Sequence, residues 1–182
     1  MTNNELAFTA LCNEYCTLMA DPFSATPKEF ITRMLHLLPR IYICASDLAS
    51  GGTLEEYGGW INATMTEEDY ESSRNAVSTL LGENDVYLEV FEEDMKYSDT
   101  PVSASISENL CDIYQALFDY LATVKMGTEA TISEAVAAIS DSFKEYWSST
   151  LCNVMRALNH LWSHDLINDD EHPASGEAES MD

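Results

Sequence analysis

The stretch SISENLCDIYQALFDYL, residues 105–121, decides the fold of this chain. Ser105 stands three residues before Glu108, the spacing of a capping box, and a capping box marks the start of a helix. At about 3.6 residues per turn, its polar residues then fall on one narrow stripe: Glu108, Asp112, Gln115 and Asp119. Nearly every other position is apolar, which is typical of a central helix. We therefore expect the stripe to meet specific partners.

The composition indicates a folded and strongly acidic globule. The 182 residues include 32 acidic and 8 basic ones, for a net charge of −24, yet 46% of the chain is hydrophobic. Disorder requires low hydrophobicity as well as high charge, so the hydrophobic fraction favours a packed core. Nucleic acid and anionic membrane surfaces both bind through basic surfaces, and we expect neither to be a partner.

The chain reads as a cytoplasmic protein. Residues 1–20 contain no Lys or Arg and no long apolar run, so no signal peptide is predicted, and no stretch has the length of a membrane span. The cysteines are odd in number and lie in helical, mostly apolar surroundings, which indicates buried, reduced thiols. They are Cys12, Cys16, Cys44, Cys111 and Cys152.

Glycine, proline and capping residues divide the chain into helices. We expect an all-α protein, a single bundle of five or six helices over residues 1–166, followed by a disordered acidic tail at 167–182. The expected helices cover 4–20, 26–48 with a kink at Pro39, 66–82, 106–125, and 131–165 as one helix or two that abut near 148–150. Residues 85–95 are expected to be extended, with no evident second strand to pair with them.

Three segments in this order resemble a known bacterial family, domain of unknown function 5063. They are HLLPRIYICASDL at 36–48, SISENLCDIYQALFDYL at 105–121 and YWSSTLCNVMRALNHLW at 146–162. The resemblance extends over about residues 8–164. It implies an all-helical bacterial cytosolic protein, and it implies no activity, because the family is uncharacterised.

A basic stripe on the second helix is a candidate partner for the acidic one. Arg33, His36 and Arg40 are spaced by three and four and share a face of an otherwise apolar helix. We expect this helix to be as buried as 106–125, with Arg33 or Arg40 pairing with Glu108 or Asp112. Alternatively, the two stripes line a shared polar cleft, the usual place for a ligand.

Metal binding is the weaker interpretation of the acidic residues and histidines. Helical bundles do build carboxylate metal sites, but the Glu-x-x-His pairs of di-iron bundles are absent. His160 and His164 have a zinc-ligand spacing and need a third ligand such as Asp165 or His172. Cys12 and Cys16 lack a second pair. We expect neither a metal nor a cofactor.

The acidic segment 55–99 is a candidate docking surface. It has thirteen acidic residues against Arg74 and Lys96, for a net charge of −11. Such a surface suits a basic protein partner, although it could also be a solvated face that maintains solubility. Aromatic residues are frequent hot spots of interfaces, and five of those in this segment are the candidate partner-binding residues: Tyr57, Trp60, Tyr70, Tyr87 and Phe91.

The sequence thus favours a non-catalytic protein-interaction module that presents an acidic surface to a basic partner. The alternative is a metal-dependent hydrolase-type enzyme that uses the carboxylates of helix 106–125. The sequence does not decide whether the protein is an enzyme, nor its partner or oligomeric state.

Overall fold

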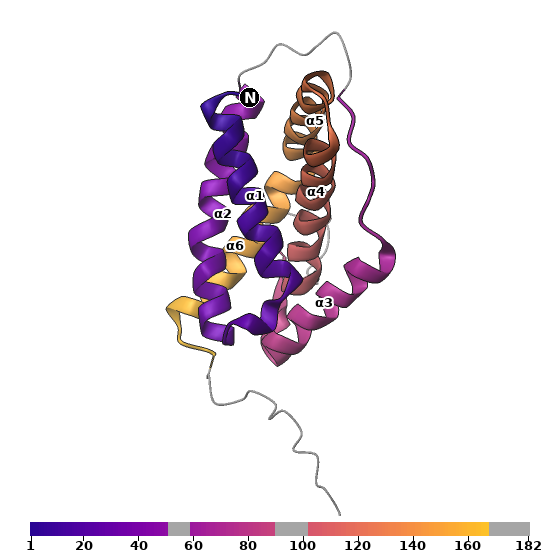
Figure 1. The fold of residues 1–182 in the computed structure, drawn as a ribbon. Helices are drawn as coiled ribbons and strands as arrows, with labels where there is room; N and C mark the ends of the chain where they lie inside the picture. The colour runs from indigo at the N-terminus through magenta and orange to yellow at the C-terminus, as the bar shows by residue number, and fades with distance from the viewer. Residues whose placement is uncertain (51–58, 90–101, 168–182) are drawn as a thin grey trace, which may run out of the picture.

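The computed structural model describes residues 1–50, 59–89 and 102–167, and it confirms an all-α fold. Six α-helices lie in these ranges, or five if the last two, which are continuous, are counted as one (Figure 1). They are α1 (Asn3–Ala20), α2 (Pro27–Ser50), α3 (Glu67–Leu81), α4 (Ile106–Met126), α5 (Glu129–Ser142) and α6 (Ser148–Ser163). No helix in the described ranges is both long enough and apolar enough to cross a membrane. The predicted acidic tail lies almost wholly outside the described residues.

Helix α4 is central, as its sequence predicts. It packs against α1, α3, α5 and α6 and contributes Leu110, Ile113, Leu117 and Tyr120 to the core. Its predicted N-cap is confirmed, because the Ser105 hydroxyl accepts a hydrogen bond from the backbone N–H of Glu108 at 3.4 Å.

A second residue, Asp85, stabilises the start of α4 from a distant point in the chain. Its side chain accepts from the Ser107 backbone N–H at 2.7 Å and from the hydroxyls of Ser107 and Ser105 at 2.7 and 2.9 Å. Asp85 is only 6% exposed. A carboxylate at a helix N-terminus satisfies unpaired N–H groups and interacts favourably with the helix dipole. The turn after α3 is thereby tied to α4.

The expectation that the extended segment has no partner strand is wrong. Strand β1 (Val86–Leu88) pairs antiparallel with β2 (Ser103–Ser105), and Val86 lies opposite Ser105. The second strand has the sequence Ser-Ala-Ser, which carries no apolar alternation to reveal a strand. Residues 90–95 of the predicted extended segment lie outside the described residues.

The last predicted helix begins earlier than expected. Thr128 caps α5 by accepting from the Thr131 backbone N–H, so the helix starts at Glu129 and not at the expected residue 131. Between α5 and α6 the chain makes a π-helical turn, Phe143–Trp147, which we label η4. The backbone N–H of Ser148 bonds to the carbonyl of Phe143, five residues back. From α5 to α6 the chain is therefore one continuous helix with a wide turn in it. This arrangement is intermediate between the two predicted alternatives, one helix or two abutting helices.

Helix α2 has a buried face and an exposed face. Phe30, Met34, Leu38 and Ile41 are buried, while Ile43 is exposed. The helix packs on α1, α5 and α6. The five cysteines are free thiols, of which Cys12, Cys16 and Cys111 are buried, Cys44 is half-buried and Cys152 is exposed.

Candidate functional site

The polar stripe of α4 is divided between a structural end and an accessible end. At the structural end, Asp119 is 7% exposed, and one carboxylate oxygen, Oδ1, accepts three hydrogen bonds. The donors are the Thr64 backbone N–H at 2.7 Å, the Thr64 hydroxyl at 2.8 Å and the Met65 backbone N–H at 2.8 Å. Asp119 thus fixes the chain immediately before the Thr66 cap of α3.

The segment 59–66 is held against α4 and α5 at further points. The Asn62 N–H donates to the Thr123 hydroxyl at 3.1 Å, and the Trp60 N–H donates to the Glu134 carbonyl at 3.3 Å. A Cβ on Gly59 would lie 2.2 Å from the backbone nitrogen of Ala138, so only glycine fits there. These contacts assign Asp119 a structural role.

At the accessible end, Asp112 joins three elements. Its Oδ1 accepts from the Tyr70 hydroxyl of α3 at 2.8 Å, and its Oδ2 accepts from the Tyr146 hydroxyl of η4 at 2.9 Å. Burial and the neighbouring carboxylate raise the pKa of Tyr146 to about 12, and the same causes raise the pKa of Tyr70. Both phenols therefore remain protonated donors at neutral pH.

Glu108 and Gln115 are exposed one turn to either side of Asp112. On neighbouring α3, Arg74 pairs with Glu71 at 2.7 Å in a half-buried contact, and the carboxylates of both Glu71 and Glu108 help to raise the pKa of Arg74. We call Tyr70, Glu108, Asp112, Gln115 and Tyr146 the Asp112 surface. The sequence prediction missed Tyr146, and its only signal was the aromatic pair ahead of the last helix.

The predicted pairing of the two stripes is wrong. Arg33, His36 and Arg40 are exposed, and within the described residues neither arginine forms an ion pair. Helices α1 and α6 each contact both α2 and α4, and so lie between them. The alternative of a shared cleft also fails for His36, because the groove that it lines is formed with α6.

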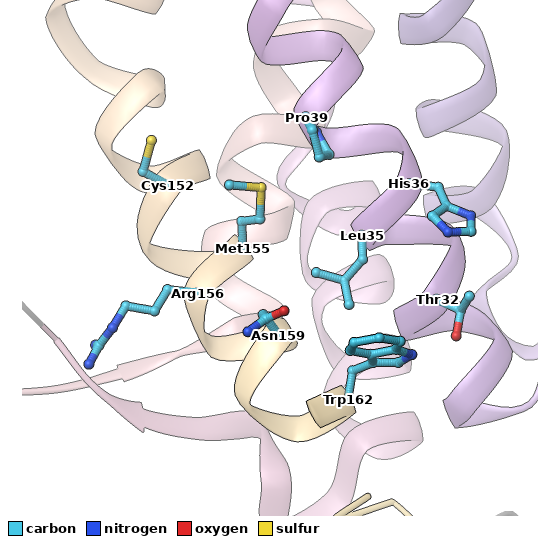
Figure 2. A pocket seen from close by; sticks show the side chains of 9 residues that line it. All are labelled: Thr32, Leu35, His36, Pro39, Cys152, Met155, Arg156, Asn159 and Trp162. Atoms are coloured by element: carbon cyan, nitrogen blue, oxygen red, sulfur yellow. The ribbon is translucent and has the colours of Figure 1, made fainter. Parts of the chain in front are cut away.

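That groove lies between α2 and α6 and has a volume of about 430 Å³. Figure 2 shows Leu35 and Trp162 directed towards one another across it, whereas Arg156 extends away from α2. We call it the α2/α6 groove, and its lining residues are Thr32, Leu35, His36, Pro39, Cys152, Met155, Arg156, Asn159 and Trp162. A second hollow of about 480 Å³ lies on the other side of α6, against β1, and shares Arg156 and Asn159 with the first.

The three predicted partner-binding aromatics that lie in the described ranges do not form one cluster. Trp60 is exposed beside α5, Tyr70 belongs to the Asp112 surface, and Tyr87 of β1 is half-buried. The Tyr87 hydroxyl accepts from the Asn109 amide and donates to the Glu89 carboxylate, which also accepts from the Asn153 amide. Tyr57 and Phe91 lie outside the described residues.

The candidate metal ligands have other contacts. His164 Nδ1 lies 3.0 Å from both the Ser163 hydroxyl and the His160 carbonyl, and Asp165 pairs with Lys28 at 2.9 Å. Burial raises the pKa of Cys12 and of Cys16, which keeps both thiols protonated. Among the described residues, no three His, Cys, Asp or Glu side chains gather as a ligand set. His172 lies outside them.

Comparison with family models matches residues 1–164 to "Domain of unknown function (DUF5063)". The chain belongs to the DUF5063 family. A crystal structure of protein BF1032 from Bacteroides fragilis is similar in fold, with a TM-score of 0.72 and 28% sequence identity over 97% of this chain and 96% of that one. A comparison with curated proteins finds no match.

The three segments that carry the DUF5063 resemblance each contribute residues to the two surfaces described above. Segment 36–48 contributes His36 and Pro39 to the α2/α6 groove, and segment 146–162 contributes its entire α6 wall. The central segment, 105–121, supplies Asp112 and the cap of α4. DUF5063 is a family of unknown function, so membership assigns the fold and leaves the role of these surfaces to be argued from their chemistry.

Proposed function

We propose that this protein is a cytoplasmic, non-catalytic interaction module that presents the Asp112 surface to a basic segment of a partner protein. Residues 1–166 form the binding domain, and 167–182 form an acidic extension outside it. The observation that carries the proposal is the placement of Asp112, whose two oxygens are fixed by the hydroxyls of Tyr70 and Tyr146 beside the exposed carboxylate of Glu108.

This arrangement suits a cationic side chain. A carboxylate has about four lone-pair positions, so Asp112 can accept further hydrogen bonds after those from the two tyrosines. An arginine fork from a partner could bond to Asp112 and Glu108 while it rests on a phenol ring. The net charge of −24 would also accelerate the approach of a basic partner.

The same contacts support binding over metal-dependent hydrolysis. A hydrolytic metal site needs several carboxylates or imidazoles converging on one point with an open coordination position. On α4, however, Asp119 is directed to the backbone of 64–65 and Asp112 to two phenols. These two carboxylates therefore stabilise contacts between elements, and the described residues supply no converging set.

The experiment is a selection of peptides from a random library on the immobilised full chain, followed by affinity measurement. We expect enrichment of Lys- and Arg-rich peptides whose affinity falls steeply with salt and at least tenfold in Glu108→Gln. The matched control is Glu14→Gln, an exposed acid on α1, which should change affinity less than twofold. If both variants lost the same affinity, the binding would depend only on the overall charge of the protein, and the Asp112 surface would be rejected as the site.

A further inference from the structure

The face formed by α2 and α6 has the opposite charge character from the rest of the chain. About one residue in six of this protein is acidic, since 32 of 182 are Asp or Glu, but α6 has no acidic residue and α2 has none from Phe30 to Ser46. Besides Lys28, which pairs with Asp165, the same two helices and the turn after α6 expose three of the other seven Lys and Arg residues and three of the four histidines. These are Arg33, Arg40, Arg156, His36, His160 and His164.

The exposed arginines of this face are not neutralised by the described protein. Arg33, Arg40 and Arg156 form no ion pair within the described residues. No residue that lines the α2/α6 groove is acidic. Because unpaired cations beside an apolar groove attract anionic groups and because the remaining surface repels them, an acidic ligand would be directed to this face.

The groove itself offers apolar anchoring. Leu35, Pro39 and Met155 line it, and Trp162 remains 55% exposed at its end (Figure 2). Tryptophan and arginine are the residue types most enriched among interface hot spots. An apolar side chain inserted between Leu35 and Trp162 would cover surface that the monomer leaves in water.

The shape favours a polypeptide segment over a small molecule. The two hollows, of about 430 and 480 Å³, flank α6 and share Arg156 and Asn159 on the ridge between them. The second hollow is bordered by Val86 and Leu88, which are themselves exposed. A small ligand is usually enclosed by one pocket, whereas an amphipathic helix can span a groove between two helices and contact the adjoining ridge.

We infer that the α2/α6 groove is a second docking site, which takes an acidic amphipathic helix from a partner protein. Apolar side chains at i, i+3 and i+7 enter the groove against Leu35, Met155 and Trp162. Acidic side chains on the flanks meet Arg156 and His36 along the rim. This site is independent of the Asp112 surface and selects the opposite charge.

The test uses the same peptide selection on the full chain, now read for acidic peptides. We expect a class of Glu- and Asp-rich peptides with helical apolar spacing, whose affinity in fluorescence anisotropy falls at least tenfold in Arg156→Glu and in Trp162→Ala. Lys144→Glu is the matched control, because Lys144 is exposed on η4 and the change alters net charge equally. Its effect should stay below twofold, and circular dichroism should show every variant folded.

Four outcomes would overturn the inference. If no acidic amphipathic peptides were selected, the proposed class of ligand would be wrong. If Arg156→Glu and Lys144→Glu lowered peptide affinity equally, the α2/α6 groove would not be the binding site. Conversion of a dimer to a monomer by Arg156→Glu in sedimentation would identify a second copy of the chain as the occupant. Peptide binding that requires deletion of residues 168–182 would identify the chain's own acidic extension. None of these depends on Glu108, so failure here is distinct from failure of the Asp112 surface.

Discussion

The Asp112 surface and the α2/α6 face treat charge in opposite ways. On α4, acidic side chains obtain uncharged partners, namely phenol hydroxyls at Asp112 and backbone N–H groups at Asp119. On α2 and α6, the arginine side chains point to solvent, and the described protein gives them no acidic partner. The difference teaches that opposite stripes in a sequence need not be complementary. Here the carboxylates of Asp112 and Asp119 accept hydrogen bonds from uncharged groups that pack against α4, and the arginines remain at the surface.

The largest expected effect comes from the buried end of the acidic stripe. Asp119→Ala removes the acceptor of three donors around Thr64 and Met65 and should lower the free energy of unfolding by about 3 kcal/mol. Urea denaturation of the purified variant measures this value. The exposed acid Asp141 on α5 is the control, and Asp141→Ala should change stability by less than about 0.5 kcal/mol. Similar losses in both variants would contradict the structural role of Asp119.

A smaller loss is expected when a phenol is removed from Asp112. Tyr70→Phe deletes one hydrogen bond from a half-buried carboxylate and should cost about 1 kcal/mol. Tyr146→Phe should cost less, because Tyr146 is 53% exposed and water can replace its hydroxyl. Urea midpoints of the two variants should therefore rank Tyr70→Phe below Tyr146→Phe. The reverse order would mean that the hydrogen bond from Tyr146 to Asp112 contributes more to stability than the one from Tyr70.

Alkaline pH should weaken the contact between Tyr146 and Asp112. The folded pKa of Tyr146 is raised from 10.0 to about 12, so its contribution to stability is complete below pH 10 and is lost as pH rises through 12. Urea midpoints measured between pH 8 and pH 11.5 should fall less steeply in Tyr146→Phe than in the wild type. Tyr114 and Tyr120, whose pKa values burial also raises to about 12, will contribute to the fall in both proteins.

The smallest effect should be at the basic stripe. Arg40→Ala should change the free energy of unfolding by less than about 0.5 kcal/mol, because the side chain is exposed and has no ion pair among the described residues. A double-mutant cycle with Asp112→Ala should give a coupling energy indistinguishable from zero. If Arg40→Ala instead lowered the free energy of unfolding by about 3–5 kcal/mol, the cost of breaking a buried ion pair, the predicted ion pair between the α2 and α4 stripes would be supported again.

The local parts of the fold could be predicted from sequence, and the long-range parts could not. The Ser105 and Thr66 caps and the apolar face of α4 depend on neighbours within one turn, and each was correctly placed. The pairing of β1 with β2, the Asp85 cap and the burial of Asp119 depend on residues fifteen or more positions away. Arg40 shows the limit of pattern reasoning, because periodicity put it on a stripe and could not tell whether that stripe faces the core or solvent.

The π turn η4 has a consequence for the register of everything that follows it. Ile139, Phe143, Trp147 and Leu151 are all buried, although they are separated by three successive steps of four residues. In a regular α-helix each such step overshoots a full turn by about 40°, so three of them would carry Leu151 about 120° away from the core. The wide turn absorbs this excess. It thereby keeps the buried face of α6 aligned with that of α5. As a result, Val154 and Leu158 of α6 are buried while Arg156 and Asn159 are exposed. The orientation of the α6 wall is thus set by a single turn that lies ahead of that helix.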